Sequence, residues 1–178
     1  PLENLLIVIY PIAALGLISA IIAHGTKEPI IHLSLYTSSH ILLSLFAYSV
    51  LTIAAVQAVL LAWQDLQLRH QRVNGFVMQL PPLQVMEQLL FELIWVGVLI
   101  LSAAIISGAF FIEDLFAQHL AHKTLLSIIA WGIFSLLLFG RHRLGWRGSI
   151  AIRWTLSGYL LLMMAYFGTK LVLEVILN

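Results

Sequence analysis

An uncharged apolar segment of more than twenty residues, from Ser39 to Trp63, most constrains what this chain can fold into. Roughly 20 apolar residues in a helix, at about 1.5 Å each, span the ~30 Å hydrocarbon layer of a bilayer. His40 stands at the start of this segment. The segment therefore predicts a membrane-spanning helix with an imidazole at one membrane surface.

The composition predicts an integral membrane protein. Of the 178 residues, 61% are hydrophobic and 10% are charged, which leaves too few polar side chains to cover a soluble globule. The formal net charge of +1 provides no basic face to neutralise phosphates, so nucleic acid is excluded as a partner. The chain has no cysteine, so disulfides, thiolate metal sites and thioether attachment of haem are excluded. A metal ligand must then be histidine, methionine, tyrosine, a carboxylate or the backbone.

Five apolar segments separated by polar residues predict an all-α, polytopic bundle of about five transmembrane helices, forming one membrane domain over residues 1–178. The fourth segment is the shortest, so we expect its helix to extend into the flanking residues. The chain begins at Pro1 without an initiator methionine, so we expect it to be a fragment of a longer protein. The predicted spans are 5–23, 39–63, 89–111, 122–139 and 150–172.

The basic residues predict the orientation of these spans. The loops after the second and fourth spans, with the residues beside them, hold six arginines, whereas the opposite side holds three lysines. The excess of basic residues faces the cytoplasm in membrane proteins, so the arginine-rich side is predicted to be cytoplasmic. The histidines predicted to lie at or near the outer side are His24, His32, His40, His119 and His122.

These outer histidines are the candidate cofactor ligands. Imidazole binds iron and other transition metals, and it is nearly neutral at pH 7, so it can be held at a helix end without a permanent charge. His119 and His122 share a face if their segment is helical, because they are three residues apart. His40 is the strongest candidate, because it begins a long span and is expected to face the bundle. The competing interpretation is that each histidine is an ordinary amphipathic residue at the lipid interface, since no HExxH motif is present.

The other polar residues in and beside the spans indicate a function less strongly than the histidines do. Glu92 lies about one turn inside the third span and is expected to reach the interface or pair with a basic group. The arginines from Arg141 to Arg153 are interpreted as a positive-inside anchor that also meets anionic headgroups. Gln57 and Trp131 have ordinary packing roles open to them. No Ser/His/Asp set, phosphate loop or carboxylate pair within a span indicates catalysis, so we expect the chain not to be an enzyme.

Several short motifs resemble the cytochrome c assembly family of haem-handling membrane proteins, and within it the HemX-like branch. The resemblance covers nearly the whole chain, and it rests on the order and spacing of the motifs. Members of this group have about eight spans, so the resemblance implies that roughly three N-terminal helices are absent here. The motifs are His40 to Tyr48, Ser107-Gly108, Lys123 followed by Trp131, Gly145-Trp146-Arg147-Gly148 and Ala165-Tyr166-Phe167-Gly168.

The resemblance implies a haem site at the outer face. In haem-delivering members a segment of the form WGxxWxWDxKET holds haem between two histidines that ligate the iron. His40 matches the first of these histidines, and Lys123 matches the lysine of the segment. The segment from Glu113 to Lys123 otherwise departs from the pattern because it contains no tryptophan. The position of the second histidine falls near Leu177, and the position of a further family histidine falls at Phe139. Both positions therefore hold another residue in this chain.

Two main hypotheses follow. The first is a haem-binding or haem-trafficking protein of the bacterial inner (cytoplasmic) membrane, with His40 as an axial ligand of the iron and other membrane or assembly-complex subunits as partners. The second ligand is then His122, His119, His32 or His24, or the iron is five-coordinate. We also expect the outer ends of the first two helices to bring His24 close to His40. The alternative is a membrane scaffold or accessory subunit that has lost the cofactor, and a third hypothesis is a small transporter lined by Glu92 and Gln57. The sequence is also compatible with self-association of the chain into a homo-oligomer.

Overall fold

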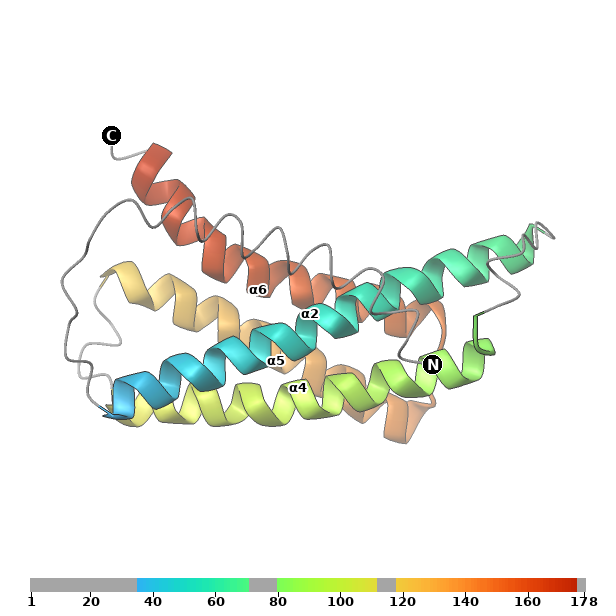
Figure 1. Ribbon diagram of the computed structural model, residues 1–178, viewed down its shortest axis with the longest axis horizontal. Helices are drawn as coiled ribbons and strands as arrows, with labels where there is room; N and C mark the ends of the chain where they lie inside the picture. Colours follow the sequence, from blue (N-terminus) through green and yellow to red (C-terminus); the bar gives the residue numbers. More distant parts are fainter. Residues whose placement is uncertain (1–34, 71–79, 112–117, 176–178) are drawn as a thin grey trace.

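The computed structural model describes residues 35–70, 80–111 and 118–175, and within these residues the only regular secondary structure is helical. The prediction of an all-α chain is confirmed for this part. The helices run as long rods that pack side by side (Figure 1). They are α2 (Leu35–Arg69), α4 (Leu83–Phe111), α5 (Gln118–Leu144) and α6 (Ser149–Val175).

Three of these helices are long and apolar enough to cross a membrane, over Thr37–Arg69, Leu83–Phe110 and Lys123–Leu144. The described part of α6 adds a shorter apolar helix, Ser149–Ala165. Four predicted spans each fall inside one helix, and α5 extends beyond the short fourth span at both ends, as expected. The predicted first span, 5–23, lies outside the described residues.

The α2–α4 pair forms one half of the bundle. The two helices lie side by side along most of their length and run in opposite directions (Figure 1). Their buried residues recur at alternating spacings of four and three, the pattern with which helices pack at shallow crossing angles. Many are alanine or glycine, which lets the backbones approach closely. They are Ala47, Leu51, Ala54, Ala58 and Leu61 on α2, and Leu90, Ile94, Gly97, Leu101, Ala104 and Gly108 on α4.

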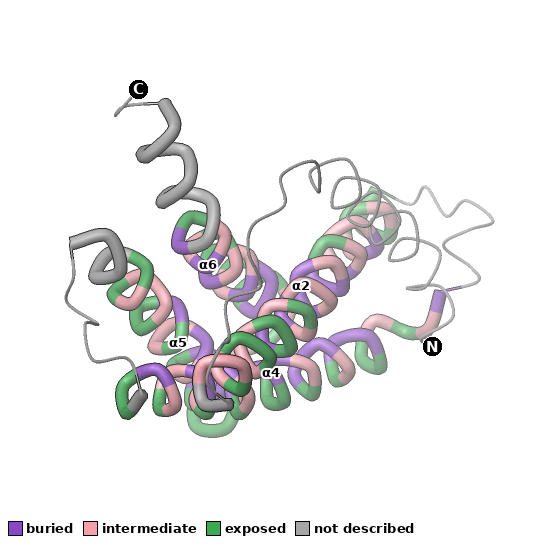
Figure 2. Tube along the Cα trace, turned by 60° about the vertical axis from the view of Figure 1, so that its left-hand side comes forward, coloured by how far each residue is buried: buried purple, intermediate pink, exposed green. Residues whose placement is uncertain are grey.

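The α5–α6 pair forms the other half by the same pattern. The tube coloured by burial shows buried residues on the sides of the helices that face one another (Figure 2). Contacts of α2 with α6 and of α4 with α5 join the two pairs. The buried positions are Ala130, Phe134 and Leu137 on α5, and Ala151, Thr155, Gly158, Leu162 and Ala165 on α6.

The outward faces of the helices are as apolar as the buried ones. Large side chains such as Phe46, Leu99, Phe110 and Leu160 are between 59% and 79% exposed. A helix that is apolar all round is typical of a membrane span, because both its faces avoid water. The helices therefore differ between their two faces in side-chain size rather than in polarity.

Gly158 of α6 lies against Phe134 of α5, and it provides a test of this packing. A Cβ at this position would lie 2.9 Å from Cζ of Phe134, a side chain that is fully buried. We expect Gly158→Ala to destabilise the bundle by about 1–3 kcal/mol, the usual cost of overpacking a core. Thermal unfolding in detergent measures this effect. The control is Gly132→Ala in α5, whose Cβ would meet no described atom within 4 Å and should not lower stability.

An ion cluster closes the end of the bundle where α2 ends and α4 begins. The Glu87 side chain is 11% exposed, and its carboxylate accepts hydrogen bonds from Arg141, from Arg147 Nε at 3.0 Å and from the Gly148 backbone N–H at 3.2 Å. The Arg141 guanidinium also lies 4.5 Å from the centroid of the Phe91 ring. The interpretation of these arginines only as a membrane anchor was therefore incomplete, because two of them hold α4 against the α5–α6 connection.

The backbone of the α5–α6 connection turns sharply beside the ion cluster. Gly145 and Gly148 both have positive φ angles, 66° and 55°, which glycine adopts without strain. The Trp146 backbone N–H donates to the Gly140 carbonyl at 3.2 Å, and the Trp146 ring packs 5.2 Å from that of Trp154. The Gly145 to Gly148 motif is thus a turn held in place by Glu87.

Candidate functional site

His40 lies in the first turns of α2, at the end of the bundle opposite to the Glu87 cluster. The imidazole is partly buried and faces α4, as the sequence predicted, rather than the surroundings. Its Nδ1 atom lies 3.0 Å from the Ala104 carbonyl oxygen and 3.0 Å from Ser107 Oγ. Both partners belong to the last turns of α4, so α4 fixes the orientation of the ring.

These contacts favour one tautomer of His40. The Ser107 hydroxyl donates its one proton to the Ala104 carbonyl at 2.9 Å. A carbonyl oxygen only accepts, so the contact with Nδ1 is a hydrogen bond when Nδ1 carries the proton. In that tautomer the lone pair lies on Nε2. Metal-binding histidines are oriented in this way, with one ring nitrogen donating to a backbone carbonyl and the other available to the metal.

Gly108 makes this orientation possible. An added Cβ at this position would lie 2.9 Å from His40 Cε1 and 3.3 Å from Nδ1, so any larger residue would push the ring away from α4. The imidazole therefore packs directly on the α4 backbone. The structure thus explains why the Ser107-Gly108 motif contains a glycine, which the sequence pattern alone did not explain.

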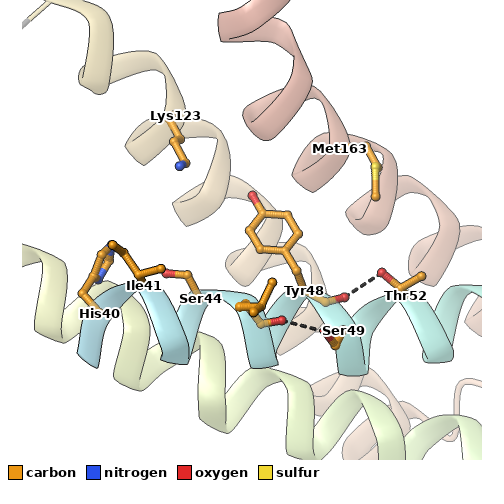
Figure 3. Close-up of a pocket in the computed structure, with 9 residues that line it drawn as sticks. His40, Ile41, Ser44, Tyr48, Ser49, Thr52, Lys123 and Met163 are labelled. Carbon is orange, nitrogen blue, oxygen red and sulfur yellow. Dashed lines mark hydrogen bonds between the residues drawn. The ribbon is translucent and has the colours of Figure 1, made fainter. Parts of the chain in front are cut away.

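The other side of His40 faces a groove between α2, α5 and α6 with a volume of about 410 Å³ (Figure 3). This volume lies within the ~300–1,000 Å³ range of small-molecule sites in proteins. The lining combines apolar side chains with hydroxyl groups and one cationic side chain. The groove is lined by His40, Ile41, Ser44, Leu45, Tyr48, Ser49, Thr52, Lys123 and Met163.

Hydroxyl groups form a polar stripe along the α2 wall of this groove. Tyr48 donates to the Leu162 carbonyl at 3.2 Å, and Thr52 donates to the Tyr48 carbonyl at 2.7 Å. Because the Thr52 proton is used there, the Tyr159 hydroxyl is the donor in its 3.1 Å contact with Thr52. The bonds from Tyr48 to Leu162 and from Tyr159 to Thr52 hold α6 against α2 below His40.

The structure describes only part of the predicted histidine cluster. His40 is the one member of that cluster whose side chain is described. His119 and His122 belong to the first turns of α5, where the backbone is helical as expected, but their side chains lie outside the described part. His24 and His32, and with them the predicted proximity of His24 to His40, also lie outside it. Among the described residues, no group of three or more His, Cys, Asp or Glu side chains is arranged to hold a metal ion.

Several residues of the groove were not singled out from the sequence. Ser44, Tyr48 and Thr52 follow His40 at successive intervals of four residues, and this spacing could have identified a polar face on α2. Met163 adds a thioether, a type of group that ligates haem iron in some proteins. Its position depends on the packing of α6 against α2, which no local pattern reveals.

Glu92 and Gln57 do not line this groove. Of the two alternatives expected for Glu92, its exposure on α4 agrees with a side chain that reaches the interface; its described partner is an amide, Gln88 Nε2 at 2.9 Å, and not a basic group. Gln57 is fully buried and donates to the Met86 carbonyl at 3.0 Å, which holds α2 against α4. Trp131 Nε1 donates to Ser102 Oγ at 2.8 Å and holds α5 against α4.

The fold and the groove define a class of protein: a multi-pass membrane helical bundle that presents an oriented imidazole to a ligand-sized groove at one end of the bundle. The family model of the cytochrome C assembly protein matches residues 4–177, so the chain belongs to the cytochrome c assembly family.

Curated relatives agree with this assignment. The chain is 36% identical over 174 residues to the inner membrane protein YpjD of Escherichia coli K12. The aligned residues are 97% of this chain and 65% of that protein. It is 33% identical over 141 residues to an uncharacterized 28.8 kDa protein of Azospirillum brasilense, covering 78% of this chain and 52% of the relative. It is 25% identical over 132 residues to protein HemX of Brevibacillus brevis, covering 73% and 48%. No solved structure matches the chain significantly.

Proposed function

We propose that this chain is part of a haem-binding or haem-handling protein of the bacterial inner membrane, with about five membrane spans, that binds haem iron through His40. The observation that carries the proposal is the geometry of His40: its Nδ1 atom lies 3.0 Å from the Ala104 carbonyl oxygen of α4, and the residue lines a 410 Å³ groove. Membership of the cytochrome c assembly family and the inner-membrane location of YpjD support it. The proposed role is binding or transfer of haem rather than catalysis.

The chemistry of the groove fits a haem. A porphyrin is a flat apolar ring with a metal at its centre and carboxylates at one edge. The groove provides one imidazole, several apolar side chains and one ammonium group, from Lys123. When bound, haem would supply an iron centre for one or two axial ligands. His40 would hold the iron, and Ile41 and Leu45 would contact the ring.

The absorption spectrum of the detergent-purified protein tests this proposal. The protein is measured as isolated and after addition of haemin, in the oxidised and reduced states, and free haemin in the same detergent serves as the control. A Soret band that shifts from that of free haemin, with saturation at one haem per chain, is the expected result. The spin state then separates a six-coordinate iron, with a second ligand from His122, His119, His32 or His24, from a five-coordinate iron. A wild-type spectrum identical to free haemin at all concentrations would contradict the proposal.

The alternative, a cofactor-free scaffold or accessory subunit, rests on the segment from Glu113 to Lys123. That segment contains no tryptophan, whereas the haem-delivering members it resembles hold haem on a tryptophan-rich platform. Fold alone does not assign function, and a family member can keep its helices while its cofactor site is lost. The same titration decides between the two, because a scaffold would leave the haemin spectrum unchanged.

Gly108→Ala tests the way in which α4 holds the ligand. The added Cβ would lie 2.9 Å from His40 Cε1, so the ring must move and lengthen its hydrogen bond to the Ala104 carbonyl. We expect haem affinity to fall about 10- to 100-fold, as it does when the partner of a metal-binding histidine is lost. The haem dissociation constant is compared with that of Gly132→Ala, whose Cβ would meet no described atom. An unchanged constant in Gly108→Ala would mean that the orientation of the ring does not matter for binding.

A further inference from the structure

Lys123 is the one lining residue of the groove that carries a permanent charge. The other eight lining residues are His40 and uncharged apolar, hydroxyl or thioether residues. Lys123 lies near the start of α5, and its side chain is drawn across the groove from His40, with Tyr48 and Met163 further along α2 and α6 (Figure 3). The groove therefore has two chemically distinct ends: one with an imidazole and an ammonium group, and one with hydroxyl and thioether groups.

This distribution of charge favours a ligand with an apolar body and an acidic edge. A lysine beside the hydrocarbon layer is costly unless its ammonium group reaches water or an anion. Lys123 is exposed and lies at the end of the span, so its ammonium group is placed where an anionic edge of a ligand would also reach water. The apolar body would then lie deeper, against Leu45 and the aromatic ring of Tyr48.

We propose that Lys123 binds a propionate carboxylate of the haem whose iron is bound by His40. The inference rests on the proposed function and adds to it the ligand chemistry that the groove selects: a tetrapyrrole with free carboxylates rather than its ester. It also gives the haem one orientation, with the acidic edge toward the outer end of α5. Lys123 acts as a positioning residue, because it contacts the periphery of the ligand and not the iron.

The test compares two ligands and several variants. Haemin and haemin dimethyl ester, in which both carboxylates are blocked, are each titrated into wild type, Lys123→Met and Lys123→Arg in detergent. Methionine keeps much of the length of the side chain and removes the charge, and arginine keeps the charge. A hydrogen bond from a charged group to a carboxylate predicts that wild type binds haemin about 10-fold more tightly than the ester. Lys123→Met should bind the two ligands within about 2-fold of each other, while Lys123→Arg should retain part of the preference.

The control variant is Arg143→Met, which removes an exposed cation at the opposite end of α5. Arg143→Met should keep the wild-type preference for haemin. It lowers the net charge of the protein as much as Lys123→Met does, but it leaves the groove unchanged. A preference for haemin that persists in Lys123→Met would overturn the inference while leaving haem binding intact. Failure of wild type to bind either porphyrin would overturn the proposed function itself.

Discussion

His40→Ala is expected to abolish specific haem binding while leaving the helical bundle folded. The imidazole is the one described side chain lining the groove that can ligate iron through nitrogen while contacts with α4 fix its orientation. Loss of a group that merely supports a metal-binding histidine costs about 10- to 100-fold in affinity, so loss of the ligand itself should cost at least about 100-fold. The measurement is a haemin titration monitored at the Soret band, with circular dichroism to verify helix content.

The matched control for this variant is His142→Ala. His142 is exposed in the last turn of α5, at the opposite end of the bundle from the groove. It removes an imidazole of the same chemistry, so nonspecific binding of haemin to surface histidines would fall equally in both variants. Equal affinities in His40→Ala and wild type would exclude His40 as the iron ligand. Addition of free imidazole should restore a six- or five-coordinate spectrum in His40→Ala if the groove remains intact.

Much of the fold could be predicted because membrane spans are determined by local composition. The segment from Ser39 to Trp63 is long, apolar and uncharged, and it lies within α2. Helices in a membrane satisfy their own backbone hydrogen bonds, so an apolar segment of this length has few other options. The residues that pack the helices together could not be separated from the lipid-facing ones by polarity, because both faces are apolar. The alternating spacing of four and three among residues such as Ala47, Leu51 and Ala54 is the signal that distinguishes the packed residues from the lipid-facing ones.

The candidate site was predicted only at its centre. The sequence identified His40 because a polar ring begins a long span, and its position against α4 agrees with the prediction that it faces the bundle. The partners of the ring, Ala104 and Ser107, are 64 and 67 residues away in the sequence. A backbone carbonyl cannot be identified as a partner from residue types, because every residue has one. The groove likewise required the packing of α6 against α2, which placed Met163 beside the hydroxyl stripe.

The ion cluster shows the same limit for charged residues. The sequence assigned no partner to Glu87, and the arginines from Arg141 to Arg153 were interpreted as a positive-inside anchor that also meets anionic headgroups. Their pairing joins residues 54 and 60 positions apart. Charge counting gives the side of the membrane on which such residues lie, because it sums over a loop. It does not identify which of six arginines meets the one buried carboxylate of the described residues.

Glu87→Gln is expected to destabilise the bundle substantially. The carboxylate accepts hydrogen bonds from two guanidinium groups and one backbone N–H, and its side chain is 11% exposed. Removing one partner of a fully buried ion pair costs about 3–5 kcal/mol. The Arg141 and Arg147 side chains are 31% and 57% exposed and can turn toward water, so we expect a smaller loss of about 2 kcal/mol. Thermal and chemical unfolding in detergent measure this loss.

The control for the ion cluster is Glu92→Gln, which neutralises a glutamate on the same helix. Glu92 is exposed and interacts with Gln88, so its neutralisation should change the free energy of unfolding by less than about 0.5 kcal/mol. Because Glu87 lies at the opposite end of the bundle from His40, haem affinity at low temperature should be the same in Glu87→Gln and wild type. Trp146 fluorescence should change in Glu87→Gln, since the turn from Gly145 to Gly148 loses its anchor. An unfolding free energy equal to that of Glu92→Gln would show that the arginines hold the connection without the carboxylate.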